Sequence, residues 1–202
     1  MKRIGVLISG RGSNLQALID AQAKGELGPG AIAVVFSNVE GAPGLERARQ
    51  AGIPVEFGDH RGRPREEFDA VVASILRGHG VELVCLAGYM RLLSPGFVKA
   101  FPGRILNVHP ALLPAFTGQS AQRRALEHGV KVSGATVHVV DEHLDAGPIV
   151  AQEAVPVRED DTEETLSARI LEAEHRIYPR AVRAMLEGRV SFAGRRARVE
   201  GA

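Results

Sequence analysis

The sequence predicts an α/β fold of three layers, with a mainly parallel twisted sheet and an antiparallel addition towards the carboxy terminus. Short apolar runs alternate with stretches of helical periodicity, which is typical of βαβ units. Hydrophobic residues make up 45% of the 202 residues and charged residues 24%, which are ordinary values for a chain that folds around a core. The run at 83–87 is wholly apolar, as expected of a strand buried on both faces.

In the amino-terminal half, strands and helices are expected in strict alternation. The expected strands are residues 4–8, 32–36, 53–57 and 82–87. A glycine-rich turn at 9–14 leads into the first helix, for which Ser13 or Asn14 is the expected N-cap. Pro43 and Pro64 open the next two helices, because proline lacks the N–H that would be unpaired in a first turn.

In the carboxy-terminal half, we expect strands at 104–108, 135–140 and 148–157. The intervening segment 141–147 is too polar for a strand and predicts a loop. A long helix begins after Thr162, whose hydroxyl suits an N-cap. No linker separates the halves, so we expect two tightly fused units, a phosphate-binding half (1–100) and a catalytic half (101–202).

Composition excludes several classes of protein. The formal net charge of +1 gives no indication that the chain binds nucleic acid or an anionic membrane. Cys85 is the single cysteine and lies in an apolar run, so it predicts a buried side chain and excludes an internal disulfide. No metal is predicted, since there is no HExxH motif. The first apolar run ends at Ile8, too short for a signal peptide, and we expect a cytoplasmic protein. The oligomeric state is not indicated.

The turn from Gly10 to Asn14 is suited to bind a phosphate. Glycines let a ligand approach the backbone, and free N–H groups point outward at the start of the following helix. Leu15 stands where a dinucleotide fingerprint has its third glycine, and the Lys-Ser/Thr pair of a P-loop is missing. A single phosphomonoester is therefore the expected ligand, and a plain tight turn is the alternative.

Asn107 and His109 form the candidate catalytic pair. They lie two residues apart at a strand's end, and so on one face of the sheet. An amide can donate to an oxyanion while an imidazole moves a proton. Asp145 follows in the polar loop, and a carboxylate beside His109 would raise the histidine pKa towards working pH. For all three residues a structural role is the alternative. His138 is expected to be a strand residue rather than a ligand.

Several segments together resemble the folate-dependent formyltransferase family. They are VLISGRGSNL (6–15), GLERA (44–48), LAGYMRLLS (86–94), LNVHP (106–110) with LLP (112–114), and LDAGPI (144–149). The resemblance implies the formyltransferase fold, with a Rossmann-like amino-terminal half. It also implies transfer of the formyl group of 10-formyltetrahydrofolate to the amine of glycinamide ribonucleotide (GAR), a step of purine biosynthesis.

The resemblance also implies which residues bind the two substrates. The turn residues Gly12, Ser13 and Asn14 would hold the GAR phosphate, and Glu174 the ribose. Asn107, His109 and Asp145 would be catalytic. Folate binding is implied for Arg65, Met90, Arg91, Leu92, Leu93, Asn107, Val140 and Asp141.

The sequence departs from the family pattern after the Leu-Leu-Pro segment. Many relatives have histidine where this chain has Ser120, and serine where it has Ala111. The change at Ser120 leaves open how Asp145 is supported. Three alternative functions also remain. A formyltetrahydrofolate deformylase is expected to carry a further domain before the first strand, and a methionyl-tRNA formyltransferase one beyond residue 200. A non-catalytic folate- or nucleotide-binding protein would not need the three candidate catalytic residues.

Overall fold

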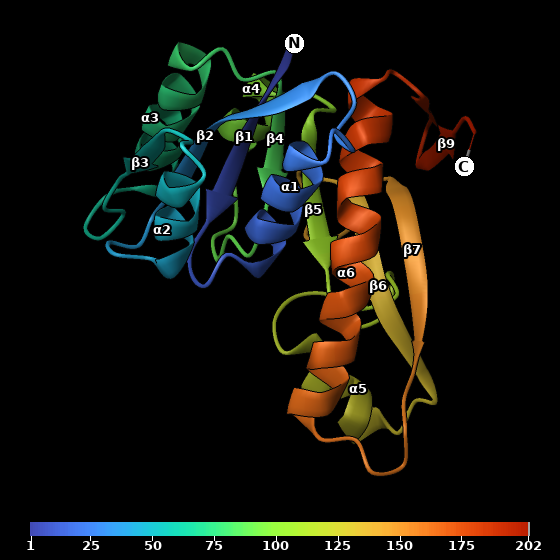
Figure 1. Ribbon diagram of the computed structural model, residues 1–202. Helices are drawn as coiled ribbons and strands as arrows, with labels where there is room; N and C mark the ends of the chain where they lie inside the picture. The colour runs from blue at the N-terminus through green and yellow to red at the C-terminus, as the bar shows by residue number, and fades with distance from the viewer. Residues whose placement is uncertain (202) are drawn as a thin grey trace.

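The computed structural model describes residues 1–201, which form a single nine-stranded sheet with helices on both faces (Figure 1). The strands are β1 (Lys2–Ile8), β2 (Gly30–Ser37), β3 (Val55–Phe57), β4 (Leu83–Leu86), β5 (Ile105–His109), β6 (Val132–Val139), β7 (Ile149–Pro156), β8 (Val190–Ala193) and β9 (Arg196–Val199). The helices are α1 (Ser13–Ala23), α2 (Pro43–Gln50), α3 (Arg65–Gly78), α4 (Pro95–Ala100), α5 (Ala121–His128) and α6 (Glu163–Leu186). Within the described residues, no helix combines the length and apolarity needed to cross a membrane.

The sheet order is β3-β2-β1-β4-β5-β6-β7-β9-β8. The first five strands of that order are parallel, whereas β6 runs antiparallel to both β5 and β7. This confirms the predicted fold class, including the antiparallel addition. It also places β4 centrally, between β1 and β5, as its apolar sequence predicts.

Alternate residues of the central strands pack into two separate cores. Val6, Cys85 and Leu106 face α1, α2 and α6, and Cys85 is buried as predicted. On the other face, α3 and α4 cover a second core that includes Val84 and Ile105. Because side chains alternate along a strand, Asn107 and His109 lie on the same face of the sheet as Ile105, the face that α3 and α4 cover.

The long helix α6 lies across β5, β6 and β7 (Figure 1). Thr162 caps it as predicted, by accepting from the Thr165 N–H while the Thr165 hydroxyl oxygen accepts from the Thr162 N–H. Farther along, the Tyr178 hydroxyl lies 2.8 Å from the Leu86 carbonyl oxygen and 3.2 Å from that of Leu106. This phenol ties α6 to the two strands that lead into the candidate site.

Two local expectations are wrong. The N-cap of α1 is Gly12, with φ 70° and no side-chain cap, rather than Ser13 or Asn14. A carboxy-terminal hairpin, β8 with β9, is not among the expected elements, since each strand has only four residues and β9 is rich in arginine. This hairpin extends the sheet through one pairing of Ile149 with Arg196.

Candidate active site

Asn107 and His109 lie at the end of β5, and the loop between β6 and β7 folds over them. His109 is 5% exposed, and its Nδ1 lies 3.5 Å from Oδ2 of Asp145. Asp145 has a φ of 50°, a conformation that aspartate adopts more readily than most residues. The structure therefore brings the three candidate catalytic residues together.

A fourth polar residue, His138 on β6, belongs to the same cluster. Register pairs it with Asn107, and its Nε2 lies 3.2 Å from the Asn107 amide nitrogen and 3.6 Å from Asp145 Oδ1. It is a strand residue, as expected, but it is also a site residue that the sequence alone did not indicate. The only sequence signal was a second histidine on a neighbouring strand, and the register that makes it meaningful is not readable from the sequence.

The tautomers of the two histidines follow from their backbone partners. His138 Nδ1 lies 3.2 Å from the Val139 carbonyl oxygen and donates there, so Nε2 accepts from Asn107 when the ring is neutral and donates to Asp145 when the ring is protonated. The Asn107 amide keeps a second hydrogen for another acceptor. His109 Nε2 lies 2.8 Å from the Phe116 carbonyl oxygen and must donate to it, which leaves Nδ1 to take up a proton facing Asp145.

Burial and charge oppose each other at His109. Burial lowers the pKa of His109 below its ordinary value, and outweighs the Phe116 carbonyl and the Asp145 carboxylate, which both raise it. The expected raised pKa is therefore wrong in its net direction, although Asp145 acts in the direction predicted. Burial alone would raise the pKa of Asp145, but His138, the Gly118 N–H and His109 together bring it below its ordinary value.

The support of Asp145 does not depend on the side chain at position 120. Oδ2 of Asp145 accepts from the Gly118 backbone N–H at 2.7 Å. Ser120 opens α5 with a φ of 55° and without a side-chain cap. A backbone amide therefore holds the carboxylate in this chain, whatever the departure at Ser120.

The glycine-rich turn and α6 meet on the other side of the sheet edge. The Asn14 amide donates to Oε2 of Glu174 at 2.8 Å, although the two residues are 160 positions apart. Glu174 is 6% exposed, and burial raises its pKa to about 7, while the bond from Asn14 opposes this. Two residues expected to bind the same substrate are thus in contact. Ser13, the third expected residue of the turn, is the first residue of α1.

Gly12 is required at the turn for two reasons. Its φ is 70°, and an added Cβ would lie 2.7 Å from the Cα atom of Gly44. We expect Gly12→Ala to lower the free energy of unfolding by at least about 2 kcal/mol and to weaken binding at the turn. Urea unfolding would measure this. Gly10→Ala is the matched control, since an added Cβ at Gly10 would meet nothing within 4 Å. Equal losses in the two variants would contradict the account.

The residues expected to bind folate line up along the loop after β4. Met90 and Leu92 are 69% and 57% exposed, which is unusual for large apolar side chains. The Met90 N–H donates to the Ser9 hydroxyl at 2.8 Å, which ties this loop to the glycine-rich turn. Leu93 and Val140 are partly buried, and each packs against the second core.

Arg65 and Asp141 lie at the edges of this group. Arg65 opens α3 at the surface, where its side chain pairs with Glu66 at 3.3 Å. Asp141 accepts from the His143 N–H at 2.8 Å, at the start of the loop that carries Asp145. The described contacts do not join either residue to the catalytic cluster. In residues 1–201, no three His, Cys, Asp or Glu side chains are grouped to hold a metal ion.

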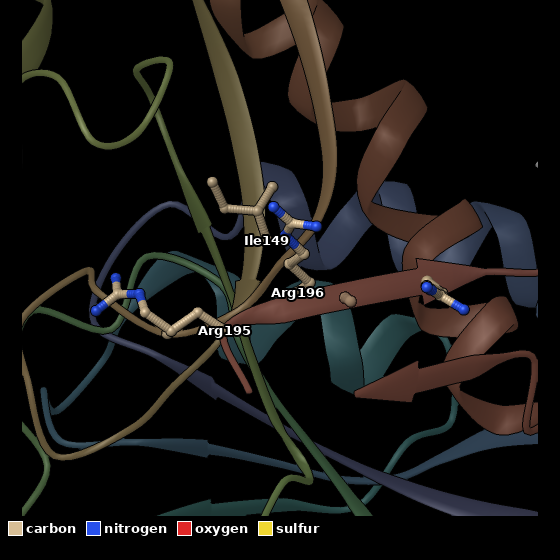
Figure 2. Close-up of a pocket in the computed structure, with 6 residues that line it drawn as sticks. Ile149, Arg195 and Arg196 are labelled. Atoms are coloured by element: carbon tan, nitrogen blue, oxygen red, sulfur yellow. The ribbon is translucent and has the colours of Figure 1, made fainter. Parts of the chain in front are cut away.

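The carboxy-terminal hairpin supports the loop that carries Asp145. Arg195 donates to the Ala146 carbonyl oxygen, and a shallow pocket lies between the hairpin and the residues Gly147 and Ile149. Figure 2 shows the Arg195 side chain extending away from Arg196 and Ile149. The hairpin therefore contacts the residue next to a candidate catalytic carboxylate.

Comparisons with known protein sequences show which family the chain is similar to. The formyl transferase family profile matches residues 2–182. The chain is 43% identical to phosphoribosylglycinamide formyltransferase of Haemophilus influenzae, over 100% of this chain and 95% of that protein. It is 50% identical over 93% of its length to the trifunctional purine biosynthetic protein adenosine-3 of Gallus gallus, but spans only 19% of that protein.

Solved structures give the same picture. Glycinamide ribonucleotide transformylase 1 from Symbiobacterium toebii is 57% identical with a TM-score of 0.96, over 98% of this chain and 94% of that one. A formyltetrahydrofolate deformylase from Pseudomonas syringae is 31% identical with a TM-score of 0.92, over 98% of this chain and 65% of that one.

Proposed function

Because the chain belongs to the formyl transferase family, we propose that it transfers the formyl group of 10-formyltetrahydrofolate to the amine of GAR. Two observations carry the proposal: Asn107, His109 and Asp145 converge at the end of β5, and Asn14 on α1 contacts the buried Glu174 on α6. The first group is suited to acyl transfer, and the second to a phosphorylated sugar at the turn.

The two substrates would enter from opposite sides of the catalytic cluster. The GAR phosphate would bind the N–H groups from Gly12 to Asn14, at the start of α1. Its ribose hydroxyls would donate to Glu174. The pterin would lie along Met90 to Leu93, against the exposed side chains of Met90 and Leu92. The link between Met90 and Ser9 keeps the two binding regions in a fixed relation.

The transfer needs one oxyanion donor and one proton carrier. The GAR amine attacks the formyl carbon, and the formyl oxygen becomes an oxyanion that accepts the remaining amide hydrogen of Asn107. His109 relays the proton that the amine loses to the folate nitrogen. The bond from that nitrogen to the formyl carbon then breaks, and the products are formyl-GAR and tetrahydrofolate. Asp145 stabilises the imidazolium form of His109 while the proton is on the ring.

The main alternative is hydrolysis, in which water replaces the amine. The deformylase shares the fold, but its identity of 31% is well below the 57% of the glycinamide ribonucleotide transformylase. A hydrolase would also have no use for a buried Glu174 beside the glycine-rich turn. A binding protein would leave the buried cluster at His109 without a purpose.

An assay with purified protein separates these functions. With GAR and 10-formyltetrahydrofolate, we expect formyl-GAR by mass spectrometry and tetrahydrofolate in equal amount. Without GAR, the folate should stay intact. Formate released at the same rate with and without GAR would establish the hydrolase instead, and an unchanged formyl group with both ligands bound would establish the binding protein.

A further inference from the structure

A buried polar cluster lies beneath the loop after β4, and its central residue has no role in the proposed function. Its centre is Asp69 on α3, which is 1% exposed. Oδ2 of Asp69 accepts from the Ser94 backbone N–H at 2.6 Å, whereas Oδ1 has no hydrogen-bond partner within residues 1–201. A buried carboxylate with one unsatisfied oxygen is costly, and so it calls for an explanation beyond packing.

Two polar atoms of the same loop also lack partners in the described part of the chain. The Tyr89 hydroxyl is buried, and so is Nε of Arg91. The Arg91 guanidinium stacks 5.0 Å from the ring centre of Phe68, the residue before Asp69. Burial raises the pKa of Tyr89 above its ordinary value, and the negative charge of Asp69 raises it further.

The cluster therefore holds one unpaired acceptor on α3, Asp69 Oδ1, and two unpaired donors on segment 89–94. Ser94 sets the other end of that segment. Its hydroxyl caps α4 by accepting from the Phe97 N–H at 3.2 Å, while its own N–H is held by Asp69. Met90 and Leu92, between these anchors, are exposed.

We propose that Asp69 is a positioning residue for the folate site, which fixes the end of segment 89–94 through its buried hydrogen bond from the Ser94 N–H. The proposal rests on the proposed function, since it takes Met90 to Leu93 as the surface that binds the pterin. Asp69 itself does not touch the substrate. Arg65 lies four residues earlier on α3, so one helix carries both a direct folate contact and the anchor of that surface.

Steady-state kinetics of Asp69→Ala and Asp69→Asn test the proposal. We expect Asp69→Ala to raise KM for 10-formyltetrahydrofolate about 10-fold, the size for loss of one buried charged hydrogen bond, with KM for GAR and kcat nearly unchanged. Asp69→Asn should fall between this variant and wild type, because its amide oxygen still accepts from Ser94. Glu67→Ala is the matched control, since it removes an exposed acid from the same helix.

Three results would overturn the proposal. One is a lower melting temperature in Asp69→Ala with KM for the folate unchanged. Another is an equal rise of both KM values. The third applies if Asp69→Ala does not fold: an Asp69→Asn variant with the wild-type KM for the folate would then overturn the proposal. A wild-type protein that makes no formyl-GAR refutes the proposed function instead. Calorimetry with tetrahydrofolate on wild type and Asp69→Asn then still tests Asp69, by whether its binding weakens.

Discussion

Replacing His109 by glutamine should lower kcat about 1,000-fold while leaving the fold intact. Glutamine can keep a hydrogen bond to the Phe116 carbonyl, but it cannot carry a proton between the amine and the folate nitrogen. Both KM values should change little, because His109 acts on the reacting atoms rather than on the bound groups. The initial rate of formyl-GAR formation at saturating substrates measures the loss.

The control for His109→Gln is His79→Gln. His79 pairs with Glu56 at 3.0 Å at the far end of α3 and takes no part in the site, so its loss should leave kcat unchanged. A His109→Gln variant with more than a tenth of wild-type kcat would exclude His109 as the main proton carrier.

Glu174→Gln should have opposite effects on binding and on stability. The carboxylate is expected to accept the ribose hydroxyls, so its replacement by a neutral amide should raise KM for GAR about 10- to 100-fold. In wild type, KM for GAR should fall as the pH rises through about 7, because burial raises the pKa of Glu174 to about 7 and only the ionised group is a strong acceptor. The variant should lose that dependence on pH.

The stability of the same variant follows from the direction of that pKa change. The folded protein holds the Glu174 proton more tightly than the unfolded chain, whose ordinary pKa is 4.5. This stabilisation is complete at pH values below the ordinary pKa and is lost as the pH rises through about 7. Above that range Glu174→Gln should be more stable than wild type by on the order of 3 kcal/mol, and at low pH the two should agree.

Denaturant unfolding at both ends of the pH range measures the stability effect. Asp20→Asn is a suitable control, since Asp20 is an exposed acid on α1, the helix that begins beside Glu174. A Glu174→Gln variant that binds GAR normally would remove Glu174 from the substrate site, even if it were more stable.

The sequence predicted most of the sheet because its strands are short apolar runs between turn signals, and it predicted the family from ordered motifs. The fold class and the family are confirmed by the structure and by the comparisons. The roles of the individual site residues stay predictions. The sequence does not show which of these residues lie close together in space. For Asn14 and Glu174 only the resemblance to the family implied a shared ligand, and the structure places the two side chains in contact.

The features of the site that could not be predicted depend on strand register and on side-chain burial. His138 joins the cluster only because β6 pairs antiparallel with β5 at the register that sets it opposite Asn107. Asp69 follows Phe68 within an amphipathic helix, and the sequence does not tell a buried aspartate from a solvated one. The lowered pKa of His109 was missed for the same reason, since burial outweighs the neighbouring carboxylate.

In this chain the support of Asp145 comes from a backbone group and not from the side chain at position 120. The sequence indicated that Asp145 lacks the histidine common among relatives, and left its support open. The Gly118 N–H supplies a hydrogen bond in which the side chain at position 120 takes no part. The hairpin contact from Arg195 to Ala146 adds a second constraint on the same loop, from a segment beyond the family match at residues 2–182.

The proposed mechanism requires that Asp145 acts through His109 in the transfer to the GAR amine. Single-turnover rates of wild type, His109→Gln, Asp145→Asn and the double variant test it most directly. We expect each single change to slow formyl-GAR formation, and the double variant to be no slower than His109→Gln, because residues that act as a unit are not additive. If the two losses multiply in the double variant, Asp145 acts independently of His109 and the account is contradicted.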